Sequence, residues 1–190
     1  MKEIIRAWKP ILVWGLVFVA VYMVGAVIDM TAVSGTCMFI LMPYFAAMAV
    51  TIPILRVKHF GSGVAVFIPY VLIGFFPLYF FDWMQKRSLA SLWAVFAYAL
   101  SGILIGLCLD LANILSARLR ERTRAIIIGA TAQAVTFAVM LIGLTYLYLP
   151  GSSMAGHLHF FNREWFLTLP WMALNGAFGG YTAYALVKRI

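Results

Sequence analysis

Six long apolar stretches divide this chain, and they constrain its fold more than any other feature. A helix needs about 20 apolar residues to cross the roughly 30 Å hydrocarbon core of a bilayer. Only 11% of the 190 residues are charged, against about 25% in soluble domains. The alternation typical of barrel strands is missing, so each stretch must satisfy its own backbone as a helix. The sequence predicts an all-α bundle of six transmembrane helices, at residues 10 to 30, 34 to 55, 60 to 81, 89 to 115, 125 to 149 and 166 to 187.

The basic residues indicate how this bundle is oriented. If the N-terminus is cytoplasmic, all 14 Lys and Arg residues lie inside except Lys86, Arg87 and Arg163, as the positive-inside rule requires. Both termini are then cytoplasmic in a multi-pass protein of a bacterial or archaeal inner membrane. The first helix lacks a cleavage site and is expected to remain. Short connections and uniform composition predict one integral membrane domain over residues 1 to 190.

The motifs of several enzyme classes are missing from the sequence. It contains no G-x-x-x-x-G-K-[ST] phosphate loop, no H-E-x-x-H, no C-x-x-C and no G-x-S-x-G. We therefore expect no catalytic residue and no cofactor in this chain. The net charge of +8 is accounted for by topology, so the expected partner is the lipid bilayer and not nucleic acid.

A candidate binding site lies at the predicted outer face, around the segment GSSMAGHLHFFNREWF at residues 151 to 166. Carboxylates and aromatic faces together suit a flat cationic or hydrogen-bonding small molecule. Asn175, with Gln133 on the preceding helix, could form the floor of such a site. An interfacial belt of aromatic residues with solvated acids is the alternative interpretation. The predicted binding residues are Asp29, Tyr79, Asp82, Trp83, Phe160, Phe161, Glu164, Trp165 and Asn175.

Two further polar features have competing interpretations. His157 and His159 could chelate a metal with Glu164, but a third strong ligand is missing nearby, so we expect hydrogen bonding within a lid. Asp110, near the inner end of its helix, is expected to form a salt bridge with the following arginines or a bond to a neighbouring helix, in preference to a proton relay.

Small residues recur at the four-residue spacing that brings membrane helices close together. On the fourth and fifth predicted helices we expect them to serve packing inside the bundle. The last helix carries more of them than internal packing requires, so we predict that Gly176 and Gly180 contact a partner subunit.

Several of these features together resemble the S-components, the substrate-binding membrane subunits of energy-coupling factor transporters. They are the six spans, the cytoplasmic termini, the missing ATPase motif and the small-residue last helix. The segments VFVAVYMVGAV and PILRVKHFGSG are similar to the hydroxymethylpyrimidine/thiamine type. The alanine-x-x-x-alanine pattern of many S-components is missing from the first helix, which moves the expected coupling surface to the last helix.

The resemblance implies that the chain captures a vitamin or vitamin precursor at its outer face. It also implies a transmembrane coupling subunit and two cytoplasmic ATPases as partners. Two alternatives remain: a non-catalytic or cofactor-scaffolding subunit of a membrane redox or metalloenzyme complex, for which Cys37 and Cys108 leave room, and a purely structural assembly subunit.

Overall fold

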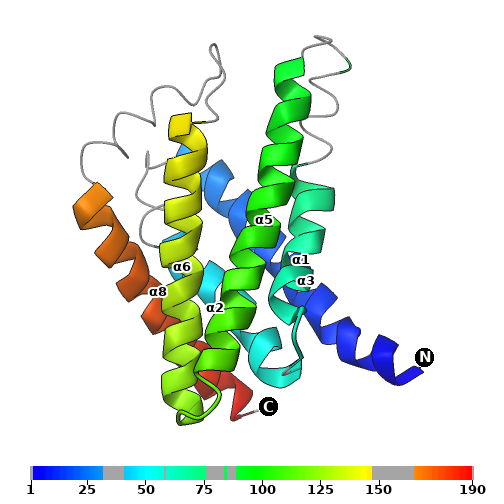
Figure 1. Cartoon of the computed structure of the whole chain (residues 1–190), viewed down its shortest axis with the longest axis vertical. Coiled ribbons are helices and arrows are strands. Elements are labelled where there is room, and N and C mark those ends of the chain that lie inside the picture. The colour runs from blue at the N-terminus through cyan, green and yellow to red at the C-terminus, as the bar shows by residue number, and fades with distance from the viewer. Residues whose placement is uncertain are drawn as a thin grey trace.

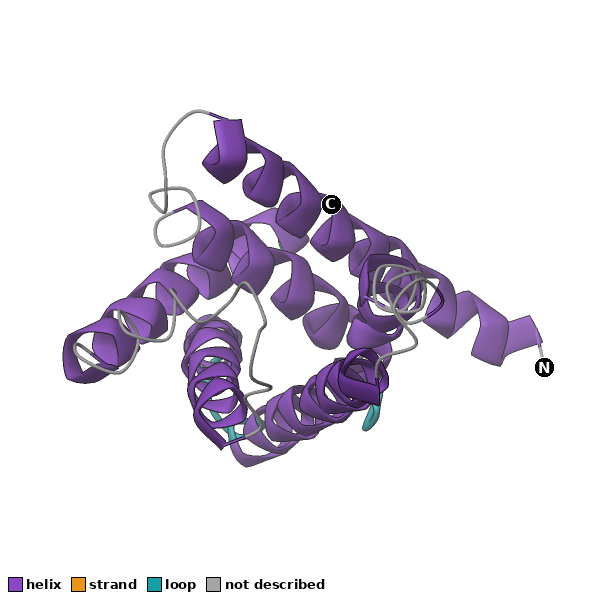
Figure 2. Cartoon of the chain, turned by 90° about the horizontal axis from the view of Figure 1, so that it is seen from above, coloured by secondary structure: helices purple, strands orange, loops and turns teal. Residues whose placement is uncertain are grey.

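Long helices make up the part of the chain that the structure, a computed structural model, describes. That part comprises residues 2–31, 41–57, 59–75, 84, 89–146 and 165–189. Figure 2 shows helices, and no strand, among these residues. The elements are α1 (Lys2–Thr31), α2 (Met42–Val57), α3 (Ser62–Pro69), the π-helical segment η2 (Tyr70–Phe75), α5 (Leu89–Leu115), α6 (Glu121–Tyr146) and α8 (Trp165–Val187).

The prediction of an all-α fold is confirmed, and each predicted span has a helical counterpart. Within the described ranges, however, no helix combines the length and the apolar character needed to cross a membrane. The transmembrane character and the orientation of the bundle therefore stay predictions.

The third helical segment changes its winding at a proline. α3 ends at Pro69, and the π-helical segment η2 follows at once. Proline has no N–H to donate to the preceding turn, so the regular hydrogen-bond ladder is interrupted there. The sequence marks this site, because Pro69 lies within the predicted third span.

The helices run up and down the bundle, and both chain termini lie at the same end. Figure 1 shows this lower end, where the α2–α3 and α5–α6 connections also lie. α8 packs against α6 and α2, whereas α3 packs against α5 and α1. The two groups meet where α2 contacts α1 and where α5 contacts α6.

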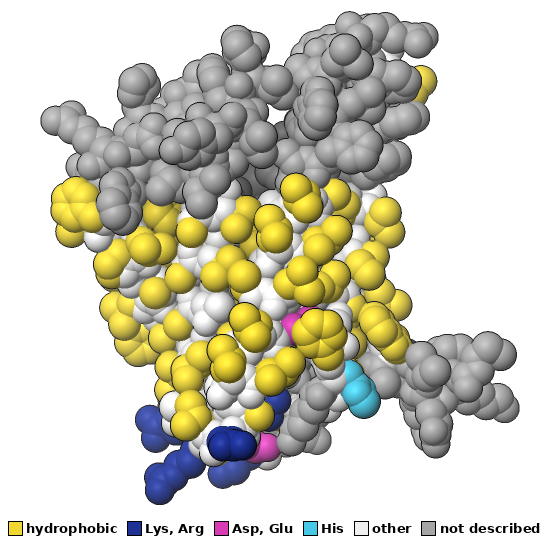
Figure 3. Space-filling model, in the orientation of Figure 1, with side chains coloured by type: hydrophobic (Ala, Val, Ile, Leu, Met, Phe, Trp, Pro, Cys, Tyr) yellow, Lys and Arg dark blue, Asp and Glu magenta, His cyan; other side chains and the backbone are white. Residues whose placement is uncertain are grey.

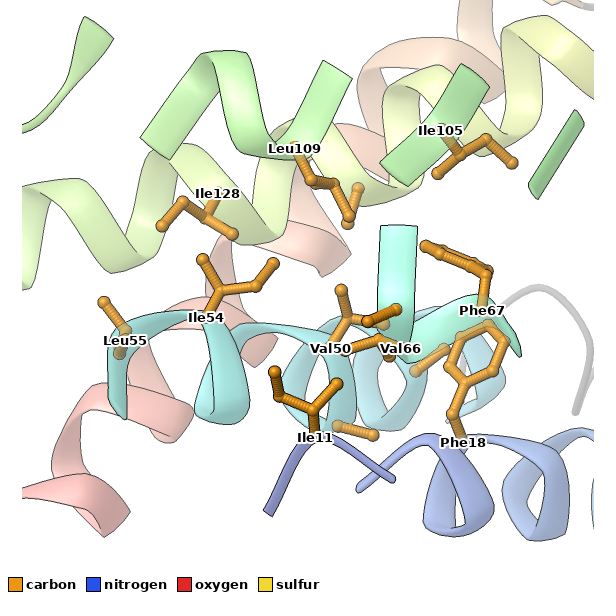
Figure 4. Close-up of a cluster of buried hydrophobic side chains, with 14 of the residues drawn as sticks. Ile11, Phe18, Val50, Ile54, Leu55, Val66, Phe67, Ile105, Leu109 and Ile128 are labelled. Atoms are coloured by element: carbon orange, nitrogen blue, oxygen red, sulfur yellow. The ribbon is translucent and has the colours of Figure 1, made fainter. Parts of the chain in front are cut away.

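Apolar side chains from α1, α2, α3, α5 and α6 form the core. Figure 4 shows Val50 and Ile54 of α2 between Ile11 of α1 on one side and Leu109 and Ile128 on the other. Farther along, the rings of Phe18 and Phe67 meet edge to face with centroids 5.2 Å apart. α2 therefore supplies the middle of the core.

Candidate functional site

The predicted outer site falls largely outside the described residues. This applies to Tyr79, Asp82, Trp83, Phe160, Phe161 and Glu164, and to the alternative metal ligands His157 and His159. Asp29 and Trp165 belong to α1 and α8, but their side chains are not among those described. Within the described ranges, no three His, Cys, Asp or Glu side chains gather at a spacing that could hold a metal ion.

Asn175 is the one predicted binding residue whose side chain is described. It is partly buried on α8, and its Nδ2 donates to the Trp171 carbonyl of the same helix at 3.3 Å. The adjacent Gly176 lies against the Cβ of Gln133 on α6, and Gln133 is only 4% exposed. The structure therefore places the two amides at the same level of the α6–α8 pair.

Gly176 and Gly180 occupy a different place from the one predicted. A Cβ on Gly176 would collide with the backbone of Gly129, and one on Gly180 with that of Ala125, both on α6. The two glycines are buried by the chain's own helix. The prediction that they contact a partner subunit is therefore corrected: they let α6 and α8 approach at backbone distance.

The most elaborate polar arrangement in the described part is centred on Asp110. Its side chain is fully buried on α5. Oδ2 accepts from the Gly61 N–H at 3.0 Å, and Oδ1 accepts from the Gly63 N–H at 2.9 Å and from the Ser62 hydroxyl at 3.4 Å. The carboxylate thus binds donors at the start of α3, where the first N–H groups have no partner within their own helix.

Glycines allow this arrangement to form. Gly61 has φ 92°, a left-handed conformation that costs glycine little. A Cβ on Gly63 would lie 2.5 Å from the Gly106 carbonyl oxygen, so α3 and α5 meet backbone to backbone one turn from Asp110. The expected bond from Asp110 to a neighbouring helix is confirmed. With both oxygens engaged, the carboxylate holds the start of α3 in place against α5.

A second polar contact joins α5 to α6 near the same end. Arg124 donates from Nε to Oδ1 of Asn113 at 2.8 Å, and Asn113 is buried. The Ala112 carbonyl, in the last turn of α5, accepts from both the N–H and the hydroxyl of Ser116, at 3.0 and 2.5 Å. These contacts shape the tight connection between the two helices.

Cations lie over aromatic rings at the lower end of the α6–α8 pair. We call this region, the first turns of α6 and the last turns of α8 with the residues just after it, the foot of α6 and α8. The Arg122 guanidinium carbon lies 4.8 Å from the ring centre of Tyr181, and the Lys188 ammonium lies 5.5 Å from that of Tyr184. Figure 3 shows Lys and Arg side chains gathered at the lower end, beneath a broad apolar surface. This end can attract anions.

Sequence reasoning missed the donors to Asp110, the Arg124–Asn113 pair and the hydrogen bond from the Tyr44 hydroxyl to Thr182 Oγ1 at 2.8 Å. The Gly-Ser-Gly at 61 to 63 before an apolar run was an available signal of a helix start. The sequence carried no signal that this segment pairs with an aspartate 47 to 49 residues away. Comparisons of the chain with protein-family models, with curated proteins and with solved structures found no match.

Proposed function

We propose that this chain is a multi-pass membrane protein with six spans and both termini in the cytoplasm. The observation that carries the proposal is the number of large apolar side chains that point outward along the bundle. Leu16 is 47% exposed on α1, Leu111 54% on α5 and Phe178 57% on α8. Soluble proteins rarely expose continuous apolar surface of this kind, whereas lipid-facing helices require it.

The charge distribution supports the orientation. The exposed basic residues lie in the last turn of α2, in the α5–α6 connection, in the first turn of α6 and just after α8, segments that Figure 1 shows at the lower end. They are Arg56, Arg118, Arg120, Arg122 and Lys188. Basic residues at one end of an apolar bundle are typical of its cytoplasmic side. Parts of the apolar stretches at 34 to 55, 60 to 81 and 125 to 149 lie outside the described residues. For these parts, the proposal rests on the hydropathy of the sequence.

Within the membrane, we propose that the chain is the substrate-binding subunit of a vitamin or vitamin-precursor uptake transporter, energised by ATPases on other chains. In the sequence, the residues expected to bind the ligand lie near the end of α1, after η2, between α6 and α8, and within α8. The ends of α6 and α8 nearest them, Tyr146 and Trp165, lie away from the basic end in Figure 1. The placement of Gln133 beside Gly176, next to Asn175, is consistent with an amide floor below that region.

Carbonate washing of membranes from expressing cells tests the first part. We expect the chain to stay in the membrane pellet, and its complete release by the wash would overturn membrane embedding.

Tryptophan fluorescence of the purified chain, titrated with thiamine and with hydroxymethylpyrimidine, tests the second part. We expect saturable quenching that Trp165→Ala and Glu164→Ala both weaken. Trp8→Ala is the matched control. Trp8 is exposed near the N-terminal end of α1, whereas the proposed site includes Asp29 near the other end, so the loss of Trp8 should leave the affinity for the ligand unchanged. Equal affinity in all variants would rule out the outer site, and bound metal or visible absorbance would favour the redox subunit.

A further inference from the structure

One face of α8 carries a stripe of large apolar side chains that no described helix covers. Its members are spaced alternately four and three residues apart, which places them on one side of a helix. Their exposed fractions run from 41% to 60%. We call this set the α8 stripe: Leu167, Trp171, Leu174, Phe178 and Tyr181.

The opposite face of α8 carries small residues in place of large ones. Gly176 and Gly180 lie against α6, and Gly179 lies against Tyr44 of α2. Helices that pack together in a membrane use small residues at the contact, because small residues let the backbones approach. These three glycines of α8 are already used inside the chain, and the bulky α8 stripe fits flexible acyl chains better than another helix.

Two cations lie at the lower end of the α8 stripe. The close contact of Ala125 with Gly180 brings the first turns of α6 beside Tyr181, and Arg122 lies over that ring. Tyr184 is three residues farther along, between Tyr181 and the side of α8 that faces α6; it is partly buried against the core, and Lys188 lies over its ring. The foot of the stripe thus combines two positive charges with two phenol groups. Glu121 is the neighbouring acid, and the surrounding arginines leave this end positive.

We propose that the foot of α6 and α8 is a binding site for a phospholipid with a net negative headgroup. The headgroup phosphate lies between Arg122 and Lys188, and the acyl chains lie along the α8 stripe. A guanidinium binds phosphate oxygens through charge-assisted, often bidentate hydrogen bonds, and a lysine adds a point charge. The two tyrosine hydroxyls can donate further hydrogen bonds. This inference rests on the membrane embedding proposed above, and it is independent of the transported ligand.

A simple topology signal would depend on the number of charges, whereas a headgroup site depends on their position. The test therefore compares two double variants that each remove two positive charges from the same end. Arg122→Gln with Lys188→Gln removes the proposed site. Arg120→Gln with Arg189→Gln removes exposed cations outside it.

The measurement is native mass spectrometry of the detergent-solubilised chain titrated with phosphatidylglycerol or phosphatidylcholine. We expect the intact chain to retain phosphatidylglycerol selectively. Affinity should fall about tenfold or more in the site variant and less than about threefold in the control, given the usual contribution of a basic side chain at an anionic lipid surface. The charge-keeping exchange Arg122→Lys with Lys188→Arg should retain binding. If the double site variant does not fold, the single variants Arg122→Gln and Lys188→Gln are compared with Arg120→Gln and Arg189→Gln, and the first two should lose more affinity.

Three results would overturn the site. Equal loss in both double variants would indicate a diffuse positive surface, and equal retention of the two lipids would remove the role of charge. Retention of a partner protein instead of lipid through Arg122 and Lys188 would assign this surface to that protein. Failure of the intact chain to remain in carbonate-washed membranes is a separate result, because it would overturn the proposed membrane embedding itself.

Discussion

Two helix contacts in this bundle are equally close but are held in different ways. α6 and α8 meet through Gly129, Gly176 and Gly180, with Ala125 and the Cβ of Gln133 beside them. α3 and α5 meet through Gly63 and Gly106, and Asp110 adds hydrogen bonds to the start of α3. This difference indicates that small residues set how near two helices can come, whereas a directional polar group fixes the residue at which one of them begins.

The largest effect is expected at the glycine contact between α6 and α8. Gly176→Leu places a side chain where even a Cβ would meet the backbone of Gly129. The helices must separate, and we expect a loss of stability of about 3 kcal/mol or more. Thermal unfolding of the purified chain in detergent measures this change, and Gly180→Leu should behave alike.

Gly102→Ala is the matched control for these substitutions. A Cβ there would meet Val71 and Phe67 at 3.4 and 3.5 Å, which is ordinary contact, and alanine favours a helix over glycine by about 1 kcal/mol. This variant should be neutral or slightly stabilised. If Gly176→Leu were equally well tolerated, the close contact of α6 and α8 would be wrong.

The next largest effect is expected from removing the carboxylate that distinguishes the second contact. Asp110→Ala leaves the N–H groups of Gly61 and Gly63 and the Ser62 hydroxyl without their acceptor. A buried donor without an acceptor costs about 1 to 3 kcal/mol, so we expect a loss of about 3 kcal/mol. Asp110→Asn keeps one acceptor oxygen and should lose about half as much in the same unfolding measurement.

Local protection gives a sharper test of what the carboxylate does. In Asp110→Ala, hydrogen exchange should increase first at residues 61 to 65, because the start of α3 is no longer held. An increase spread evenly over the chain would mean that Asp110 supports the fold generally and does not fix this helix start.

A smaller effect is expected at the contact between α5 and α6. Arg124→Gln removes the hydrogen bond from Nε to Asn113, and we expect a loss of about 1 kcal/mol, which is usual for one such bond. Asn113→Ala and the double variant complete a mutant cycle. Fully additive losses would show that the two side chains do not act as a pair.

The smallest change should have the opposite sign. Thr51 of α2 is completely buried, and its hydroxyl has no hydrogen-bond partner among the described residues. Thr51→Val keeps the shape and removes the buried polar group, so we expect no loss and a gain of up to about 1 kcal/mol. A clear destabilisation would indicate that the hydroxyl has a partner, such as a bound water molecule.

The sequence predicted the helices better than their contacts. The α5 helix was placed at its observed bounds, 89 and 115, because one unbroken apolar run precedes a charged connection. α6 begins four residues before its predicted start, since Glu121 and the arginines beside it can be solvated at the end of a helix and still belong to it. The third span was predicted as one helix, and hydropathy alone could not show the π-helical winding after Pro69.

The candidate site, too, was only partly predictable from the sequence. The sequence singled out Asp110 as unusual, because a carboxylate so deep in an apolar stretch needs a partner. It could not identify the donors at residues 61 to 63, because that pairing depends on how α3 and α5 approach each other. The role of Gly176 and Gly180 was misjudged for the same reason: a stripe of small residues indicates a close contact but not which helix makes it.

By itself, the sequence determined the class of the fold, the approximate extent of each described helix and the gathering of basic residues in the segments at one end. These follow from composition and from backbone hydrogen bonding within each segment, which are local properties. Only the tertiary structure decided which helices meet, that Asp110 holds the start of α3, and that the large side chains of α8 point outward while its glycines face α6 and α2. Those outcomes depend on distances between residues far apart in the chain, and a linear pattern carries no such distances.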